Sequence, residues 1–410
     1  MAPSDRSGAA RTGVGVYYLI STAGHPNLGD ELITRSWLRV LAERAPDVDV
    51  WLDCPNPAGA QALLADAHPR LRCVDTLFRL CWEAPSDDAW EVAAFVGRAL
   101  DDHGQAPRWV PGLRRFGQAA VVHLIGGGFV NGVWPRHLGL LAALDWAARH
   151  GAQAAMTGQG LAPLGEDTVS LVRRLVRRLD TVDVRDRTSA DLLGLPEAHS
   201  GDDLWLAEMP TLIDAERAAG IDAVVCVQGD QLDGRGCERL TEQCLAHLDR
   251  WGADPARTAV LECIPRVDRG IFDRLAGLLP GLQFVSWVEL LEHGVPAAAH
   301  QRWFSTRFHP HLIASAMGAR GVAVPVRPGY YDVKHGSLIE AGSAWHLVEP
   351  GSGGVAELEA DRPGTLAVTG AQVRSRKLAI AGRLYGPGLP GPVVPAPRAD
   401  RRLLATAGTS

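Results

Sequence analysis

Short apolar, β-rich runs alternate with helix-length amphipathic segments along most of this chain. The first run, residues 14–20, is followed by a turn rich in Gly, Pro and Asn and then by the helical pattern of residues 31–44. Strands that alternate with helices predict a parallel sheet covered by helices on both faces. With 46% hydrophobic and 21% charged residues, the composition is that of a globular protein.

The alternation restarts around residues 206–219, which predicts two domains. Strands are expected at residues 14–20, 48–52, 71–74, 119–125, 152–157 and 181–184, then at 223–227, 258–262, 283–285, 303–306 and 321–324. Helices are expected at 31–44, 136–150, 167–178, 236–251, 268–279 and 310–317. A chain of 410 residues is too long for one core. We therefore expect two Rossmann-like α/β domains, 12–208 and 209–350, facing each other across a cleft. A C-terminal extension, 351–410, follows, and its last ~25 residues are expected to be flexible.

Charge and cysteine usage exclude several classes of protein. A net charge of −6 offers no basic face for nucleic acid. Seven scattered cysteines without a C-x-x-C pair indicate reduced thiols rather than a disulfide framework or a zinc site. No signal peptide and no apolar run of membrane-spanning length is found. We expect a cytoplasmic protein without a membrane span.

The loop after the first strand, residues 24–31, enters a helix. Gly29 allows a tight turn, and Asp30 falls at the predicted helix start, where a carboxylate can cap exposed N–H groups. Alternatively, Asn27 or Asp30 holds a hydroxyl of a ligand. Three consecutive glycines, residues 126–128, follow the best buried strand and would let a ligand approach the backbone closely. The Gly-Gln-Gly loop of residues 158–160 makes the same case more weakly, and a plain turn is the alternative for each.

Several cationic or proton-carrying side chains follow other strands. Arg185 either pairs with Asp186 or points into the cleft at an anion. In residues 305–313, Pro310 suits a first helical position, which predicts His309 at the N-cap and Arg307 just before it. A helix N-terminus favours anions, arginine can hold a carboxylate or phosphate, and histidine can exchange a proton. His309 could instead serve only as a cap.

Two further residues carry weaker signals. Lys334 adds a flexible cation or belongs to a solvated loop, and Trp134 could stack on a sugar or be core. His309 and His311 are two residues apart, a spacing that does not present two ligands to one metal on a helix, so no metal is predicted.

Taken in order, these motifs resemble the polysaccharide pyruvyl transferase family. The resemblance is carried by residues 27–31, 126–128, 158–160, 184–186 with Ser189, 201–203, 307–309 and 331–334, within about residues 15–345. It implies a glycosyltransferase-B-like fold and transfer of a pyruvyl group from phosphoenolpyruvate to two sugar hydroxyls, with release of phosphate. The sequence departs from the family pattern by an apparent insertion at 327–329 and by the tail beyond residue 350.

The resemblance assigns roles to individual residues. Arg307 and His309 match the family's Arg-x-His donor site, Lys334 its lysine, and Arg185 the arginine of its Arg-Asp motif. We expect His309 to protonate C3 of phosphoenolpyruvate and Asp30 to act as a base on the acceptor. The predicted substrate-binding residues are Arg307, Lys334, Arg185, Asn27, Gly29, Gly126, Gly127, Gly128 and Gln159. Phosphoenolpyruvate is expected as co-substrate without any cofactor, and the acceptor is a sugar or a glycan of the cell envelope that could be lipid-linked.

Two other functions fit the same patterns. A nucleotide-sugar glycosyltransferase of the same fold would also use cleft arginines and a glycine loop, but it would release a nucleoside diphosphate. A non-catalytic carbohydrate- or metabolite-binding protein is the third reading. The presence of Arg307, His309 and Lys334 together argues against that last reading.

Overall fold

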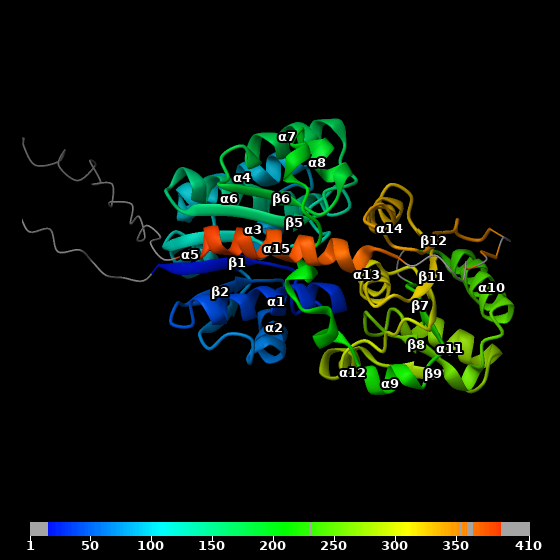
Figure 1. Ribbon diagram of the computed structural model, residues 1–410. Helices are drawn as coiled ribbons and strands as arrows, with labels where there is room; N and C mark the ends of the chain where they lie inside the picture. The colour runs from blue at the N-terminus through cyan, green and yellow to red at the C-terminus, as the bar shows by residue number, and fades with distance from the viewer. Residues whose placement is uncertain (1–14, 230–231, 353–354, 357, 359–363, 387–410) are drawn as a thin grey trace, which may run out of the picture.

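The computed structural model describes residues 15–229, 232–352, 355–356, 358 and 364–386. These residues form two parallel sheets of six strands each (Figure 1). The first contains β1 (Val16–Ile20), β2 (Val50–Asp53), β3 (Leu71–Val74), β4 (Ala119–Leu124), β5 (Gln153–Gln159) and β6 (Thr181–Val184). The second contains β7 (Ala223–Cys226), β8 (Thr258–Leu261), β9 (Gln283–Val285), β10 (Arg302–Ser305), β11 (Arg320–Ala323) and β12 (His346–Leu347).

Both sheets have the same strand order. The first runs β3-β2-β1-β4-β5-β6 and the second β9-β8-β7-β10-β11-β12. This is the doubly wound Rossmann order, which confirms the predicted fold class of two Rossmann-like α/β halves. The direction of winding reverses between β1 and β4 and again between β7 and β10. In such sheets ligands bind at this switch point, beyond the carboxyl ends of the strands.

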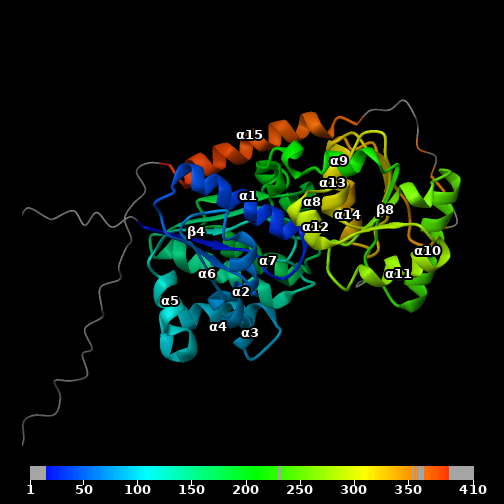
Figure 2. The same ribbon diagram turned by 90° about the horizontal axis from the view of Figure 1, so that it is seen from below.

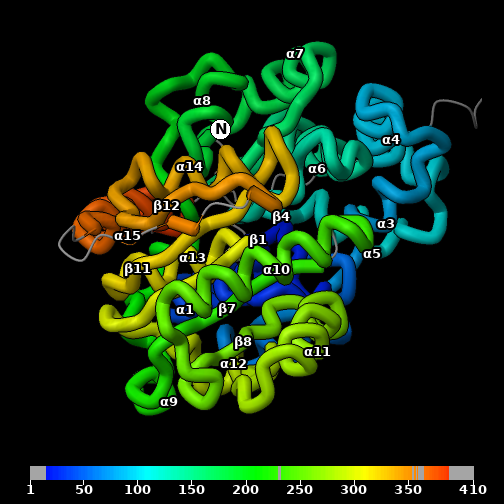
Figure 3. Tube along the Cα trace, turned by 90° about the vertical axis from the view of Figure 1, so that its right-hand side faces the viewer, coloured from blue at the N-terminus to red at the C-terminus, as the bar shows by residue number. Residues whose placement is uncertain are grey.

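Helices cover both faces of each sheet. They are α1 (Leu28–Arg44), α2 (Pro57–Leu64), α3 (Thr76–Glu83), α4 (Ala89–Asp101), α5 (Val110–Phe116), α6 (Gly139–Arg149), α7 (Glu166–Val176) and α8 (Arg187–Leu193), then α9 (Ala215–Ala219), α10 (Gly234–Arg250), α11 (Arg269–Leu278), α12 (Trp287–Glu292), α13 (Phe308–Ala316), α14 (Tyr331–Glu340) and α15 (Leu366–Leu384). In the view of Figure 3, α10 and α11 lie over the second sheet, where their apolar residues pack against β7 and β8. One buried apolar cluster joins the two halves, because Trp37 of α1 and Trp287 of α12 belong to the same core.

The last helix, α15, returns from the second half to the first. Figures 1 and 2 both show it lying along the first sheet, beside α1. Its end is fixed there by Tyr385, whose ring lies 4.9 Å from that of Tyr17 between centroids and whose hydroxyl is 2.7 Å from Nδ1 of His123. The sequence pattern predicted only an extension here, without a helix.

Helices α1 and α13 begin two or three residues before their predicted starts. Helix α1 begins at Leu28, so its N-cap is Asn27, whose side chain accepts from the N–H of Gly29, and Asp30 lies in the first turn. Helix α13 begins at Phe308, so Arg307 occupies the N-cap position and His309 lies inside the first turn. Neither Asp30 nor His309 is therefore the cap that the sequence suggested.

The domain boundary at residue 208 stays a prediction, and the tail expected to be flexible lies largely outside the described residues.

Candidate active site

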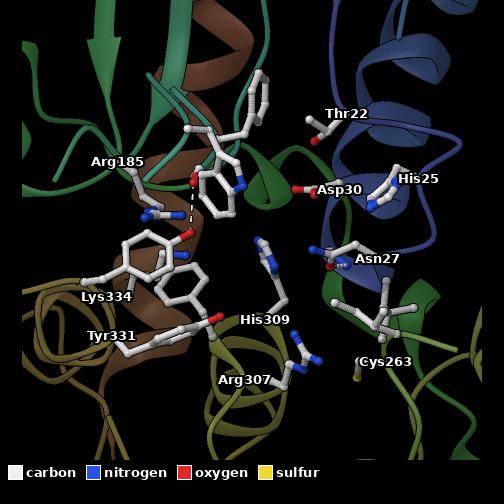
Figure 4. A pocket seen from close by; sticks show the side chains of 18 of the residues that line it. Thr22, His25, Asn27, Asp30, Arg185, Cys263, Arg307, His309, Tyr331 and Lys334 are labelled. Atoms are coloured by element: carbon white, nitrogen blue, oxygen red, sulfur yellow. Dashed lines mark hydrogen bonds between the residues drawn. The ribbon is translucent and has the colours of Figure 1, made fainter. Parts of the chain in front are cut away.

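A cavity of about 350 Å³ lies between the two halves, at the carboxyl ends of their strands (Figure 4). The loop after β1 and the loop after β4 meet there, which is the switch point of the first sheet. The loop after β10, the neighbour of β7, closes the other side. The cavity is lined by residues of both halves. They are Thr22, His25, Asn27, Leu28, Gly29, Asp30, Pro55, Trp82, Gly128, Phe129, Trp134, His137 and Arg185 from the first half, with Cys263, Ile264, Arg307, Phe308, His309, Pro310, Tyr330, Tyr331 and Lys334 from the second half.

The start of α1 forms one wall. Glu31 turns back to accept the N–H of Gly24 at 2.7 Å, which holds the loop after β1 in place, and burial raises the pKa of this carboxyl to about 8. Burial also raises the pKa of Asp30, although His309, Thr22 and Lys334 oppose that shift. A carboxyl with a raised pKa is a better proton acceptor, and a role of Asp30 as a base stays a prediction.

The start of α13 forms the opposite wall. Arg307 pairs with the buried Asp268, and that carboxylate also accepts the main-chain N–H groups of Cys263 and Ile264. Because Asp268 is anchored to the backbone, it fixes the guanidinium at the edge of the cavity. Figure 4 shows His309 in the middle of the cavity, between Asp30 on one side and Arg185 with Lys334 on the other.

The buried carboxylate of Asp202 contacts both His309 and Arg185. One of its carboxylate oxygens lies 3.5 Å from Nε2 of His309 and 4.0 Å from a terminal nitrogen of Arg185. Burial raises the pKa of Asp202, but the charges of His309 and Arg185 outweigh it, so the net pKa is lowered. Arg185 also pairs with Asp186 at 3.5 Å and lies 4.6 Å above the ring of Phe308. Arg185 therefore does both things that the sequence left open: it pairs with Asp186 and it lines the cavity.

Lys334 projects from α14 into the cavity and is buried. Its ammonium lies 3.5 Å from the centroid of the Tyr330 ring and 4.8 Å from that of Tyr331. Burial and the charge of Arg185 hold the pKa of Lys334 well below its ordinary value. The hydroxyl of Tyr330 donates to the carbonyl of Gly128 at 2.9 Å, which joins α14 to the triple-glycine loop. The alternative prediction, that Lys334 belongs to a solvated loop, was wrong, because Lys334 is buried and lies in α14.

Most of the residues singled out in the sequence meet in this cavity. Asn27, Gly29, Asp30, Gly128, Arg185, Arg307, His309 and Lys334 all line it. Gly126, Gly127 and Gln159 are buried behind it instead. The N–H of Gly126 donates to Asp203 at 2.8 Å, and the side-chain amide of Gln159 donates to the carbonyl of Ile125 at 2.5 Å. Direct substrate binding by these three residues stays a prediction, and their observed contacts support the loops.

Sequence reasoning missed Asp202, Asp268 and Tyr330 as site residues. Asp202 belongs to a Gly-Asp-Asp motif that was noted for the resemblance, so its role could have been found there. Tyr330 directly precedes the motif of residues 331–334, but its contact with Gly128 appears only in the folded chain. Asp268 gave no signal, because only the folded chain brings it beside Arg307. Within the described residues, no group of three or more His, Cys, Asp or Glu side chains could hold a metal ion.

Residues 27–222 match the polysaccharide pyruvyl transferase family. The resemblance found in the sequence is confirmed over this stretch, which contains Asn27, Asp30, Arg185 and Asp202. Arg307, His309 and Lys334 lie beyond its end, so their family roles rest on the motifs and on the geometry of the cavity. No curated protein matches the sequence significantly.

Solved structures with a similar fold include UDP-N-acetylglucosamine 2-epimerases. A UDP-N-acetylglucosamine 2-epimerase has a TM-score of 0.51 at 12% identity, covering 92% of this chain and 98% of its own. A putative UDP-N-acetylglucosamine 2-epimerase from Listeria monocytogenes has a TM-score of 0.50 at 12% identity, covering 92% and 93%. The UDP-GlcNAc 2-epimerase from Methanocaldococcus jannaschii has 0.50 at 10%, covering 90% and 99%. At this identity the similarity shows the fold alone, which is glycosyltransferase-B-like. No helix in the described part of the chain is long and apolar enough to cross a membrane.

Proposed function

We propose that the protein transfers a pyruvyl group from phosphoenolpyruvate to two hydroxyls of a sugar or glycan, forming a pyruvate ketal and releasing phosphate. One observation carries the proposal: Arg185, Arg307 and Lys334 converge on a cavity whose centre holds His309 and whose far wall holds Asp30. The family match supports the transferase class. The seven free cysteines support a cytoplasmic site of action.

The cations suit the donor. Phosphoenolpyruvate carries a carboxylate and a phosphate, and both are held best by charge-assisted hydrogen bonds from arginine and lysine. Arg307 is held in place by Asp268, and Arg185 by Asp186 and Asp202, so neither guanidinium needs to reorganise when the donor binds. The buried Lys334 would regain a counter-charge from the same donor.

The proton transfers assign a role to each remaining residue. His309 gives a proton to C3 of phosphoenolpyruvate, which turns the methylene into a methyl group and makes C2 electrophilic. The first acceptor hydroxyl bonds to C2 and loses its proton to Asp30. The bond from C2 to the bridging oxygen then breaks, and phosphate leaves with the electron pair and takes the proton held by Asp30, which restores the base. The second hydroxyl bonds to C2 and its proton returns to His309, which completes the ketal and restores the acid.

The test is a reaction with phosphoenolpyruvate and a panel of glycans, including lipid-linked ones. Released phosphate is measured together with the mass of the acceptor. The expected result is a mass gain equal to one pyruvate less one water for every phosphate released. His309→Asn serves as the inactive control, because asparagine keeps the size but cannot donate the proton. Phosphate release without an acceptor product, or turnover of a UDP-sugar with release of UDP, would reject the proposal.

A further inference from the structure

The two walls of the cavity differ in chemistry. The described lining residues between positions 22 and 137 include no Lys or Arg, but they include three large aromatic side chains, Trp82, Phe129 and Trp134, here called the aromatic wall. The cations among the described lining residues are Arg185, later in the first half, and Arg307 and Lys334 of the second half, where Phe308, Tyr330 and Tyr331 also line the cavity. An anionic ligand would therefore be held near these cations, which leaves the aromatic wall for a neutral ligand.

Trp134 lies at the inner end of the aromatic wall. Its ring is 6.0 Å from that of Tyr330 between centroids, in an edge-to-face arrangement. Tyr330 in turn lies directly under the ammonium of Lys334. Trp134 is thus one aromatic ring away from a cation assigned to the donor, which places it beside the reacting centre.

Trp82 lies at the outer end of the wall, in the last turn of α3. Its side chain is 59% exposed although it lines the cavity. A single exposed indole needs no functional explanation. This one, however, is fixed: the guanidinium of Arg136 lies 5.3 Å from its ring centroid and donates to the main-chain carbonyls of Trp82 at 3.0 Å and Ala84 at 2.9 Å. Since Arg136 is two residues after Trp134, one side chain ties together the two segments that carry the indoles.

We propose that Trp134 and Trp82 form an extended acceptor subsite for a neutral oligosaccharide of at least two pyranose rings. The inner ring lies on Trp134 and presents its hydroxyls to the donor, and the next ring lies on Trp82. A pyranose has an apolar face that suits an indole, and two indoles at different depths of one cavity require an extended ligand. The identity of the inner ring as the acceptor rests on the proposed function, whereas binding on Trp82 does not.

The test is binding to a glycan array of cello-, chito- and manno-oligosaccharides, from monosaccharides to tetrasaccharides. The wild-type protein should bind at least one series more tightly as it lengthens from one ring to two. Trp82→Ala should remove this gain, about 3- to 10-fold, as expected for one lost aromatic contact. Trp90→Ala is the matched control, because Trp90 is also exposed and has Arg174 over its ring at 4.8 Å, yet it does not line the cavity. It should keep the gain.

Three results would overturn the subsite: no series gains affinity with length, Trp82→Ala keeps the gain, or Trp90→Ala loses it too. The increase in melting temperature caused by phosphoenolpyruvate is measured on the same proteins and should be equal in all of them. Phosphoenolpyruvate could fail to raise the melting temperature while Trp82→Ala still removes the gain in affinity for longer glycans. In that case the assignment of phosphoenolpyruvate as donor fails and the subsite stands.

Discussion

His309 is the general acid of the proposed mechanism, and the folded chain removes its simplest alternative role. Because α13 begins at Phe308, the His309 side chain caps no helix and instead contacts Asp202 at 3.5 Å. A buried carboxylate behind a histidine fixes the orientation of the ring. Asp202 thus holds the His309 side chain toward the cavity.

Replacing His309 with Asn should therefore reduce turnover more than it reduces stability. We expect kcat to fall by roughly 10²- to 10⁴-fold, the usual contribution of a general acid or base. The melting temperature and the dissociation constant of phosphoenolpyruvate should change little. Steady-state kinetics and a thermal melt with and without the donor measure all three. Wild-type turnover in this variant would remove His309 from the mechanism.

The buried position of Lys334 predicts that the protein takes up a proton when the donor binds. The pKa of Lys334 is lowered by burial and by Arg185, and an anion bound beside it favours the charged form. Phosphoenolpyruvate should therefore take up a proton as it binds, at pH values between the lowered pKa of the free protein and the higher pKa of the complex. Affinity should fall as pH rises through that range, because the neutral amine must first be protonated.

Calorimetric titrations in buffers of different ionisation enthalpy measure this uptake. Lys334→Arg is the control, since arginine is always protonated and contributes no uptake at that position. The arginine variant should still bind phosphoenolpyruvate, which a thermal shift verifies. An uptake as large in the arginine variant as in the wild type would show that another group takes the proton.

At the scale of elements, the active cavity is made by two helix N-termini that touch. Gly29 in the first turn of α1 packs so closely against α13 that a Cβ at this position would lie 1.7 Å from Nδ1 of His309. Gly29 has no positive φ angle, so its backbone conformation does not require glycine. What the close approach of the two helices requires is the absence of a side chain at this position. The two halves of the chain thus meet at His309.

Gly29→Ala should displace His309 and lower kcat, without unfolding the protein. Alanine has a higher helix propensity than glycine by about 1 kcal/mol, so stability should not suffer from the backbone change itself. Gly97→Ala in α4 is the matched control, since nothing lies within 4 Å of a Cβ there and its activity should be unchanged. Kinetics beside a urea unfolding curve separates the two effects. Normal turnover in Gly29→Ala would show that the ring has room to move.

The same contact shows where sequence reasoning succeeded and where it stopped. The strands β1 to β11 were predicted because a buried parallel strand is a short apolar run between turns, and β3, β6 and β9 have the predicted bounds. The two-residue strand β12 was missed, because its residues His346 and Leu347 form no such run. The cations and glycines of the cavity follow such strands, so their convergence could be predicted too. Helix starts were less certain, because Asn27, Asp30 and Pro310 all suit a first turn. The pairing of Arg307 with Asp268 could not be predicted, since it joins loops after different strands.

At the scale of the whole molecule, α15 of the C-terminal extension packs against the loops of the first half that lie behind the cavity. Its Lys377 is fully buried and pairs with Asp183 and Asp203 of the first half. Each carboxylate also accepts the N–H of a glycine loop, Gly158 at 3.0 Å by Asp183 and Gly126 at 2.8 Å by Asp203. Asp203 is the neighbour of Asp202, so the helix supports the residue that orients His309.

Lys377→Met should therefore destabilise the protein strongly, because it leaves two buried carboxylates without their cation. Breaking one side of a buried ion pair costs about 3–5 kcal/mol. Arg376→Met is the matched control: it removes the same charge one position away on the same helix, from an exposed side chain, and should cost little.

The loss of stability in Lys377→Met should also depend on pH. Burial raises the pKa of Asp183 and Lys377 lowers it, so without Lys377 that carboxyl protonates more readily in the folded state. The variant should regain part of its stability relative to the wild type as pH falls toward 4, measured by urea unfolding across pH. A deficit that is equal at every pH, or equal in Arg376→Met, would show that the buried charges do not hold α15 in place.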